Sequence, residues 1–175
     1  MSAPHTKQPA DELPDAESLR CAIVVSRYHS DITAALLAGA QEVFLARHGK
    51  EQNLLVVDSP GAFELTAICG TLARGEATFG KPDVIVTLGC VLTGETTHDQ
   101  HIAQSIRQGI TSITVNTGVP IAFGVLTCQT MQQAKARAMP AHSSQGSNKG
   151  AETMEAAIEI AHTIKLLKST KRNSQ

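Results

Sequence analysis

The stretch DVIVTLGCVL (83–92) decides the fold, because its apolar residues run on without the alternation typical of a strand with one wet face. A run of this kind is typical of a strand covered on both faces, as in a parallel sheet between two layers of helices. Three more apolar runs of strand length occur in the chain: LRCAIVV (19–25), NLLVV (53–57) and VPIAFGVLT (119–127). The sequence therefore predicts a four-stranded parallel sheet.

Helical patterns separate and follow these four strands. Ser30 precedes the first helix, where its hydroxyl could cap the free N–H groups of the helix start. Strands that alternate with helices through right-handed crossovers give an α/β fold, here a three-layer sandwich. The helices are expected between Ser30 and Gly49 and at 64–75, 97–118, 130–138 and 150–168.

A single domain accounts for the length of the chain. Its 175 residues are 42% hydrophobic and 18% charged, as in an ordinary globular protein. We expect a flexible N-terminal arm at 1–18, a folded domain at 19–169 and a short polar C-terminal tail at 170–175.

Charge, hydropathy and cysteine spacing exclude several classes of protein. The net charge of −1 argues against broad electrostatic binding of nucleic acid. No apolar run approaches the roughly 18 residues that a membrane span needs, and residues 1–18 contain no apolar stretch of a signal peptide. Cys21, Cys69, Cys90 and Cys128 form no CxxC pair, so disulfides and structural zinc are not expected. We therefore expect a cytoplasmic protein with reduced thiols and with neither nucleic acid nor membrane as a partner.

The ends of the predicted strands are the segments to search for a site, because ligands of such sheets bind beyond the carboxyl ends of the strands. SRYH (26–29) follows the first strand, DSPGAFE (58–64) the second and TGETTH (93–98) the third. A flat heterocycle could stack on the rings of Tyr28 and Phe63 there. Core packing is the alternative for Phe63 and for Phe123, which lies inside the fourth predicted strand.

The segment GETTH (94–98) opens the third predicted helix. Free N–H groups with threonine hydroxyls beside them suit a phosphate, although plain capping by Thr96 or Thr97 is the common alternative. Neither a P-loop nor a dinucleotide fingerprint is present. The segment therefore indicates an anion site without nucleotide chemistry.

Four further charged or ionisable residues are candidates for chemistry. His98 stands in the first turn of that helix and could move protons near neutral pH. His101 lies three residues further on, but no third ligand is evident, so no metal is expected. Arg137 and Lys149 flank a polar loop, where each could pair with an anion or remain solvated. No nucleophile signature such as Gly-x-Ser-x-Gly occurs.

Five short groups of residues at the strand ends and helix starts carry a family resemblance. They are SRY (26–28), PGAFE (60–64), LGCV with GETTH (88–98), FGVLT (123–127) and NKGAE (148–152). Each group is weak alone, but together, over roughly residues 20–168, the chain resembles the lumazine synthase family. The resemblance implies a flavodoxin-like sandwich, a catalytic domain at 19–169, and the penultimate step of riboflavin biosynthesis without a metal or an organic cofactor.

The reaction that the resemblance implies condenses 5-amino-6-(D-ribitylamino)uracil with 3,4-dihydroxy-2-butanone 4-phosphate. The products are 6,7-dimethyl-8-ribityllumazine, phosphate and water. His98 matches the proton shuttle of the family, Tyr28 the aromatic residue that stacks on the pyrimidine, and Phe123 a pocket residue from a neighbouring subunit. By the same resemblance, the pocket would be lined by Ala62, Phe63, Glu64, Cys90, Val91 and Leu92, and the phosphate held by Glu95, Thr96, Arg137 and Lys149.

Sites shared between subunits imply a homo-oligomer. The loop between Arg137 and Asn148 is longer than in capsid-forming members of the family, which favours a pentamer over a sixty-subunit shell. The sequence also departs from the family: His29 replaces a frequent Asn, and DQH (99–101) stands where an aromatic, a carboxylate and an aromatic are usual.

Two other functions compete with the enzyme. A non-catalytic flavodoxin-like module that binds flavin or lumazine would keep Tyr28 and Phe63, but it would not need both His98 and Arg137. A structural shell with secondary catalysis is the second alternative, and its particle size, measured by light scattering, would distinguish it from a smaller enzyme assembly. The joint presence of His98 and Arg137 favours the enzyme.

Overall fold

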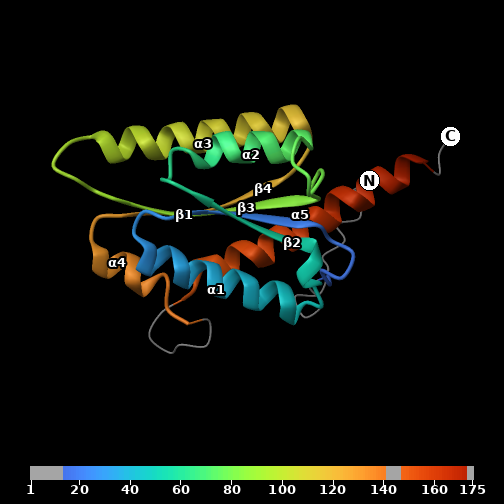
Figure 1. The fold of residues 1–175 in the computed structure, drawn as a ribbon, viewed down its shortest axis with the longest axis horizontal. Helices are drawn as coiled ribbons and strands as arrows, with labels where there is room; N and C mark the ends of the chain where they lie inside the picture. Colours follow the sequence, from blue (N-terminus) through green and yellow to red (C-terminus); the bar gives the residue numbers. More distant parts are fainter. Residues whose placement is uncertain (1–13, 141–146, 173–175) are drawn as a thin grey trace, which may run out of the picture.

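A four-stranded parallel sheet forms the centre of the molecule, as the sequence predicts. The computed structural model describes residues 14–140 and 147–172, and Figure 1 shows its fold. All neighbouring strands pair in parallel, in the order β2-β1-β3-β4. Their bounds are Cys21–Ser26 for β1, Leu54–Ser59 for β2, Val84–Leu92 for β3 and Ile121–Cys128 for β4.

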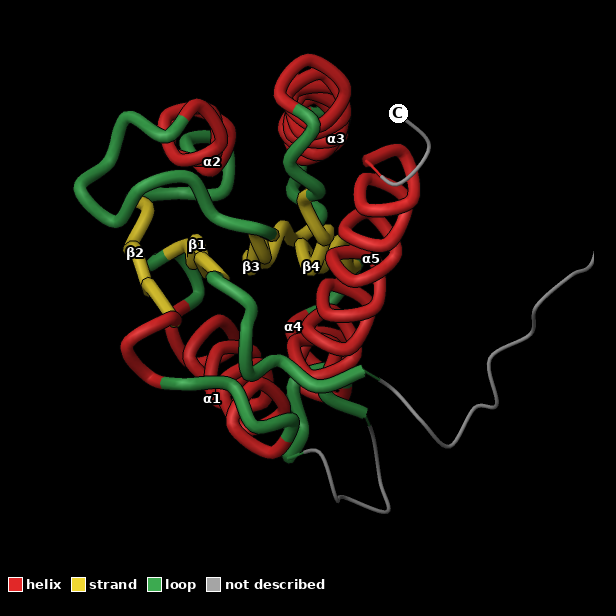
Figure 2. The backbone as a smooth tube through the Cα atoms, turned by 90° about the vertical axis from the view of Figure 1, so that its right-hand side faces the viewer, coloured by secondary structure: helices red, strands yellow, loops and turns green. Residues whose placement is uncertain are grey.

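Helices cover both faces of the sheet, which confirms the three-layer α/β sandwich. Figure 1 and Figure 2 show α2 and α3 on one face, and α1, α4 and α5 on the other. A 3-10 turn before β2, η1 at Glu51–Asn53, was not predicted. None of the helices within the described ranges is long and apolar enough to cross a membrane. The α-helices are α1 Ser30–Ala46, α2 Leu65–Arg74, α3 His98–Thr117, α4 Met131–Ala136 and α5 Lys149–Arg172.

Burial on both faces explains why the sequences of the two central strands, β1 and β3, show no alternation. Every residue of β1 is buried, and so is β3 from Val84 to Val91. Successive side chains enter two different hydrophobic clusters: Ile23 packs with α1 and α5, and Val24 packs with α2 and α3. Each such side chain stabilises the fold by about 1.5–3 kcal/mol through the hydrophobic effect.

The layer of α1 and α5 is closely packed through small residues. A Cβ atom on Gly150 would overlap the carbonyl oxygen of Leu36, and one on Gly39 would overlap the side chain of Asn148. Asn148 is 4% exposed and bridges the two helices through its amide. The backbones of α1 and α5 therefore approach each other as closely as glycine allows.

The first helix begins differently from the sequence-based expectation, and the cap assigned to Ser30 is wrong. His29 is the N-cap residue, with left-handed angles of φ 57° and ψ 52°, and it makes no side-chain cap bond. The chain leaves β1 through a turn at His29, so Ser30 is already the first helical residue. His belongs to the few residue types that adopt this conformation more readily than most.

Both ends of the folded region extend beyond the boundaries expected from the sequence. Helix α5 continues to Arg172, past the expected helix end at residue 168 and into the stretch expected to be a polar tail. Residues 1–13 of the expected arm lie outside the described residues. Within the rest of that arm, Ala16 is fully buried and its N–H donates to the carbonyl oxygen of Arg47 at 2.6 Å. The packed domain therefore begins before residue 19.

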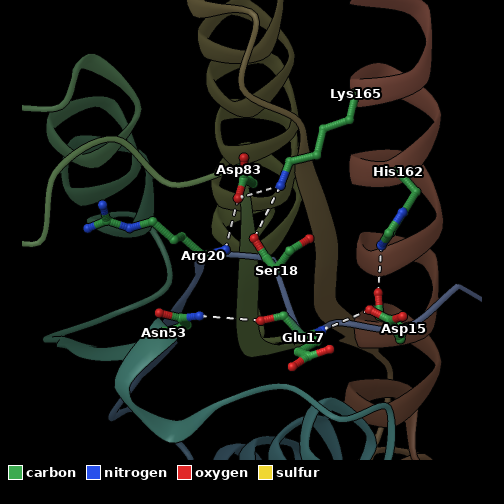
Figure 3. Close-up of polar contacts among 8 residues, drawn as sticks. All are labelled: Asp15, Glu17, Ser18, Arg20, Asn53, Asp83, His162 and Lys165. Atoms are coloured by element: carbon green, nitrogen blue, oxygen red, sulfur yellow. Dashed lines mark hydrogen bonds and ion pairs between the residues drawn. The ribbon is translucent and has the colours of Figure 1, made fainter. Parts of the chain in front are cut away.

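Polar contacts hold the segment before β1 at the amino ends of the strands (Figure 3). The Asp83 Oδ2 atom accepts the backbone N–H of Arg20 at 2.9 Å and lies 3.0 Å from Lys165 Nζ. The Nε2 atom of His162 lies 2.5 Å from the carbonyl oxygen of Asp15. These polar groups of the amino edge pair with one another, so the far end of α5 is tied to the beginning of the sheet.

Candidate functional site

A cavity of about 880 Å³ opens at the carboxyl edge of the sheet, beside the first turns of α2 and α3. Four segments line it: residues 28–29 after β1, residues 61–64 before α2, residues 90–94 at the end of β3, and the region of residues 96–105 at the start of α3. Strands that run in parallel deliver their carboxyl ends to one edge, and a ligand site at that edge follows from the topology.

Most of the predicted site residues meet in this cavity. They come from segments that lie far apart in the sequence, and the sheet brings them together. Those that line the cavity are Tyr28, Ala62, Phe63, Glu64, Cys90, Val91, Leu92, Thr96 and His98.

Two aromatic rings at the cavity are free of core packing. Tyr28 is 66% exposed and Phe63 is 55% exposed, so Phe63 is not a core residue. The ring of Tyr28 meets the ring of His29 edge-on, with 4.7 Å between centroids and 72° between planes. Both aromatic rings remain available to stack on a flat ligand.

The start of α3 supplies polar groups to the same cavity. Thr97 is the N-cap residue and makes no side-chain cap bond, whereas the backbone N–H of His98 lies 3.4 Å from the hydroxyl of Thr96. His98 itself is exposed. A helix start with few internal partners attracts anions, because its N–H groups and dipole present positive charge.

Asp99 is a cavity residue whose role the sequence did not reveal. It is 7% exposed, and its Oδ1 atom has no hydrogen-bond partner in the part of the chain that the structure describes. The signal lies in its spacing: Asp99 precedes the buried Ile106 by two helical turns, so both share the inward face of α3. Burial of a carboxylate oxygen without a partner is uncommon in folded proteins.

The cysteine at the cavity is not an activated thiol. Burial, together with the neighbouring Cys128, raises the pKa of Cys90 to about 11. Burial also raises the pKa of Cys69, on α2, to about 12. Because the thiolate is the reactive form, these thiols are neutral and inert near pH 7.

Three histidines line the cavity, namely His29, His98 and His101. Within residues 14–140 and 147–172, no three His, Cys, Asp or Glu side chains form a group that could hold a metal ion. The Nε2 atom of His101 lies 3.5 Å from the hydroxyl of Thr97. The cavity presents its imidazoles singly, as proton carriers or hydrogen-bond partners.

Four predicted site residues do not line this cavity: Glu95, Phe123, Arg137 and Lys149. Phe123 lies in β4 and is 44% exposed. Arg137 and Lys149 are neighbours, because the Lys149 N–H donates to the Arg137 carbonyl oxygen at 2.8 Å. Arg137 Nη1 also donates to the Gln133 carbonyl oxygen at 3.0 Å, and Lys149 Nζ lies 2.5 Å from Glu152.

An α/β sandwich with a parallel sheet of this order is a flavodoxin-like fold, and here its cavity at the carboxyl edge is lined by two aromatic rings and by imidazoles. The family model of 6,7-dimethyl-8-ribityllumazine synthase matches residues 18–165, and the chain belongs to this family. Membership connects the chain with lumazine synthesis in riboflavin biosynthesis.

Proposed function

We propose that the chain condenses 5-amino-6-(D-ribitylamino)uracil with 3,4-dihydroxy-2-butanone 4-phosphate to 6,7-dimethyl-8-ribityllumazine, phosphate and water. The main support is the cavity, which gathers the exposed rings of Tyr28 and Phe63 and the imidazole of His98 in one space. The pyrimidine would stack on the rings, with Ala62, Glu64 and the end of β3 around it. Membership of the family supports this reaction over other uses of a flat ligand.

His98 is the proton carrier of the proposed reaction. The amine attacks the ketone and loses water to form an imine, phosphate leaves by elimination, and ring closure then loses a second water. Each step moves a proton, and an imidazole can both accept and donate one near neutral pH. Holding the two substrates together supplies up to about 7–11 kcal/mol of the barrier reduction. We therefore expect the variant His98→Ala to be slowed, by about 10²-fold or more, without becoming inactive.

The phosphate group would be held at the start of α3, by the hydroxyl of Thr96 and the backbone of Glu95, with Arg137 and Lys149 supplying positive charge. Phe123, which is half exposed and outside the cavity, would complete the site of a neighbouring subunit. The active assembly would then be a homo-oligomer, which we propose to be a pentamer in the cytoplasm, and an isolated chain would be inactive.

The assay that tests the reaction follows formation of the lumazine by its absorbance. The two substrates can react slowly unaided, so a blank without protein runs alongside the wild type. Arg137→Ala is the test variant, and Lys135→Ala is its control, because Lys135 is an exposed cation in the last turn of α4 and Arg137 is the C-cap residue of that helix. We expect a wild-type rate well above the blank, a loss of at least ten-fold in Arg137→Ala, and little change in Lys135→Ala.

A wild-type rate equal to that of the blank would overturn the proposal that the chain is an enzyme. If the lumazine still bound, as measured by equilibrium titration, the non-catalytic binding module would replace it. Light scattering on the same sample separates a pentamer from a sixty-subunit shell.

A further inference from the structure

Asp99 carries an unused hydrogen-bond acceptor at the candidate site. Among the described residues, its Oδ1 atom is the one buried side-chain polar atom without a partner. Asp99 is only 7% exposed, and it borders the cavity together with His98 and Ile102. The other inward residues of α3, Ile106 and Ile110, are apolar, as the core requires.

A buried carboxylate without a partner destabilises the fold. An ionised carboxylate only accepts hydrogen bonds, and leaving one of its oxygens unpaired in a dry site is costly. The positive end of α3 offsets part of that cost, but it does not supply a donor to Oδ1. A residue that lowers stability in this way is expected where a bound molecule supplies the missing donor.

The chemistry of the two proposed substrates decides which one supplies the donor. This step rests on the proposed function. The butanone phosphate carries a single hydroxyl donor, and its dianionic phosphate group accepts hydrogen bonds and is repelled by a carboxylate. The ribitylaminopyrimidine carries ring N–H, amine and ribityl hydroxyl groups, all of which donate.

We propose that the Asp99 carboxylate accepts a hydrogen bond from an N–H or O–H group of the ribitylaminopyrimidine and selects this substrate. Asp99 is then a specificity-determining residue at the position where the family usually has an aromatic side chain. The carboxylate binds the donor-rich substrate, while the start of the same helix faces the phosphate of the other.

Two variants of Asp99 test the assignment through the KM of each substrate. Asp99→Asn keeps the shape of the side chain and removes its charge, whereas Asp99→Leu removes all hydrogen bonding. We expect the KM for the pyrimidine to rise by about ten-fold in Asp99→Asn and by more in Asp99→Leu, while the KM for the butanone phosphate stays constant or falls. An unchanged KM for the pyrimidine, or an equal rise for both substrates, would overturn the assignment.

Thermal stability separates a binding role from a structural one. If the carboxylate is kept for its ligand, Asp99→Leu raises Tm of the ligand-free protein by about 2–4 °C, because the unpaired group is gone. If the carboxylate instead stabilises the fold, Asp99→Leu lowers Tm of the ligand-free protein. Asp31→Asn is the control, because Asp31 is the acidic residue in the first turn of α1 and is exposed. It should lower Tm slightly and leave both KM values unchanged.

The two proposals fail in different ways. A wild-type rate at the level of the blank removes the proposed function, and the assignment of Asp99 falls with it. A wild-type rate above the blank with unchanged KM values in both Asp99 variants removes the assignment alone.

Discussion

Helices α5 and α3 both begin at the carboxyl edge of the sheet, on opposite faces (Figure 1), and their starts are built differently. At the start of α5, Asn148 Oδ1 accepts the N–H of Ala151 at 3.0 Å, and Asn148 Nδ2 donates to the Ala35 carbonyl oxygen at 2.9 Å. The acidic residue of the first turn, Glu152, lies 2.5 Å from Lys149 Nζ. The chain itself therefore satisfies the polar groups of this start.

The start of α3 leaves the corresponding groups open. The N-cap residue Thr97 makes no side-chain cap bond, and the acidic residue of the first turn, Asp99, has a buried oxygen without a partner in the described ranges. A Cβ atom on Gly94 would meet nothing within 4 Å, whereas one on Gly150 would overlap the carbonyl oxygen of Leu36. One start is closed by packing, and the other borders a cavity of about 880 Å³.

The difference separates structural from functional uses of the same local motif. Both starts combine a polar N-cap residue with a carboxylate in the first turn, which stabilises a helix through its dipole. At α5 these groups find partners within the chain, whereas at α3 the Thr97 hydroxyl meets only the ring of His101 and the Asp99 Oδ1 atom has no partner among the described residues. Groups left unsatisfied at α3 lower stability, and their presence beside a cavity is the expected mark of a ligand site.

The largest expected effect comes from adding one methyl group at the closed start. Gly150→Ala forces the backbones of α1 and α5 apart, because the new Cβ overlaps the Leu36 carbonyl oxygen, and should destabilise the fold by about 3 kcal/mol. The matched change at the open start, Gly94→Ala, should alter stability by less than about 0.5 kcal/mol. Urea unfolding at a fixed protein concentration measures both. Equal effects would remove the distinction between the two starts.

Deletion of the two N-cap side chains is the next test. Asn148→Ala loses one buried and one half-buried hydrogen bond and should cost about 1–2 kcal/mol. Thr97→Ala loses no cap bond and should cost less than about 0.5 kcal/mol. Thermal unfolding of the two variants gives the comparison directly. A Thr97 variant as unstable as the Asn148 variant would contradict it.

The general fold follows from sequence patterns because the strands and the chain order depend on local features. Apolar runs without alternation predicted the four strands, and the residues after the strands predicted much of the cavity wall, including Tyr28 and Phe63. These predictions succeed because a parallel sheet sends every strand end to the same edge. The N-cap assigned to Ser30 failed because the turn at His29 depends on a positive φ that side-chain chemistry alone does not reveal.

The open start is harder to predict, because it depends on how α3 is rotated against the sheet. Asp99 and Gln100 are both polar neighbours in sequence, yet only Asp99 points inward. That rotation is set by Ile106 and Ile110 further along the helix, through tertiary packing. The roles of Phe123, Arg137 and Lys149, which do not line the cavity of a single chain, stay predictions.

The pH dependence of stability tests whether Cys90, in the wall of the cavity, is shielded from water. The pKa of Cys90 is raised by burial from 9.0 to about 11, so the unfolded chain loses this proton at lower pH than the folded one. The stability that the protonated Cys90 thiol contributes to the folded state is complete below pH 9 and is lost as the pH rises from 9 to about 11. At pH 10 the loss should be about 1 kcal/mol relative to pH 8. Urea unfolding of the wild type and of Cys90→Ala at pH 8 and pH 10 measures this loss. An equal loss in the variant would contradict the burial of the Cys90 thiol.

The smallest expected effect concerns the carboxylates of the two first turns, and there the sign matters more than the size. Glu152→Gln breaks a half-exposed ion pair with Lys149 and should cost about 0.3 kcal/mol, which about 1 M salt should abolish by screening. The same change at the open start, Asp99→Asn, should instead stabilise the ligand-free protein, because it removes charge from a buried oxygen that has no partner in the described part of the chain. Paired urea titrations at low and high salt resolve the two signs. If both changes destabilise, Asp99 is held by partners as Glu152 is, and the open start is no different from the closed one.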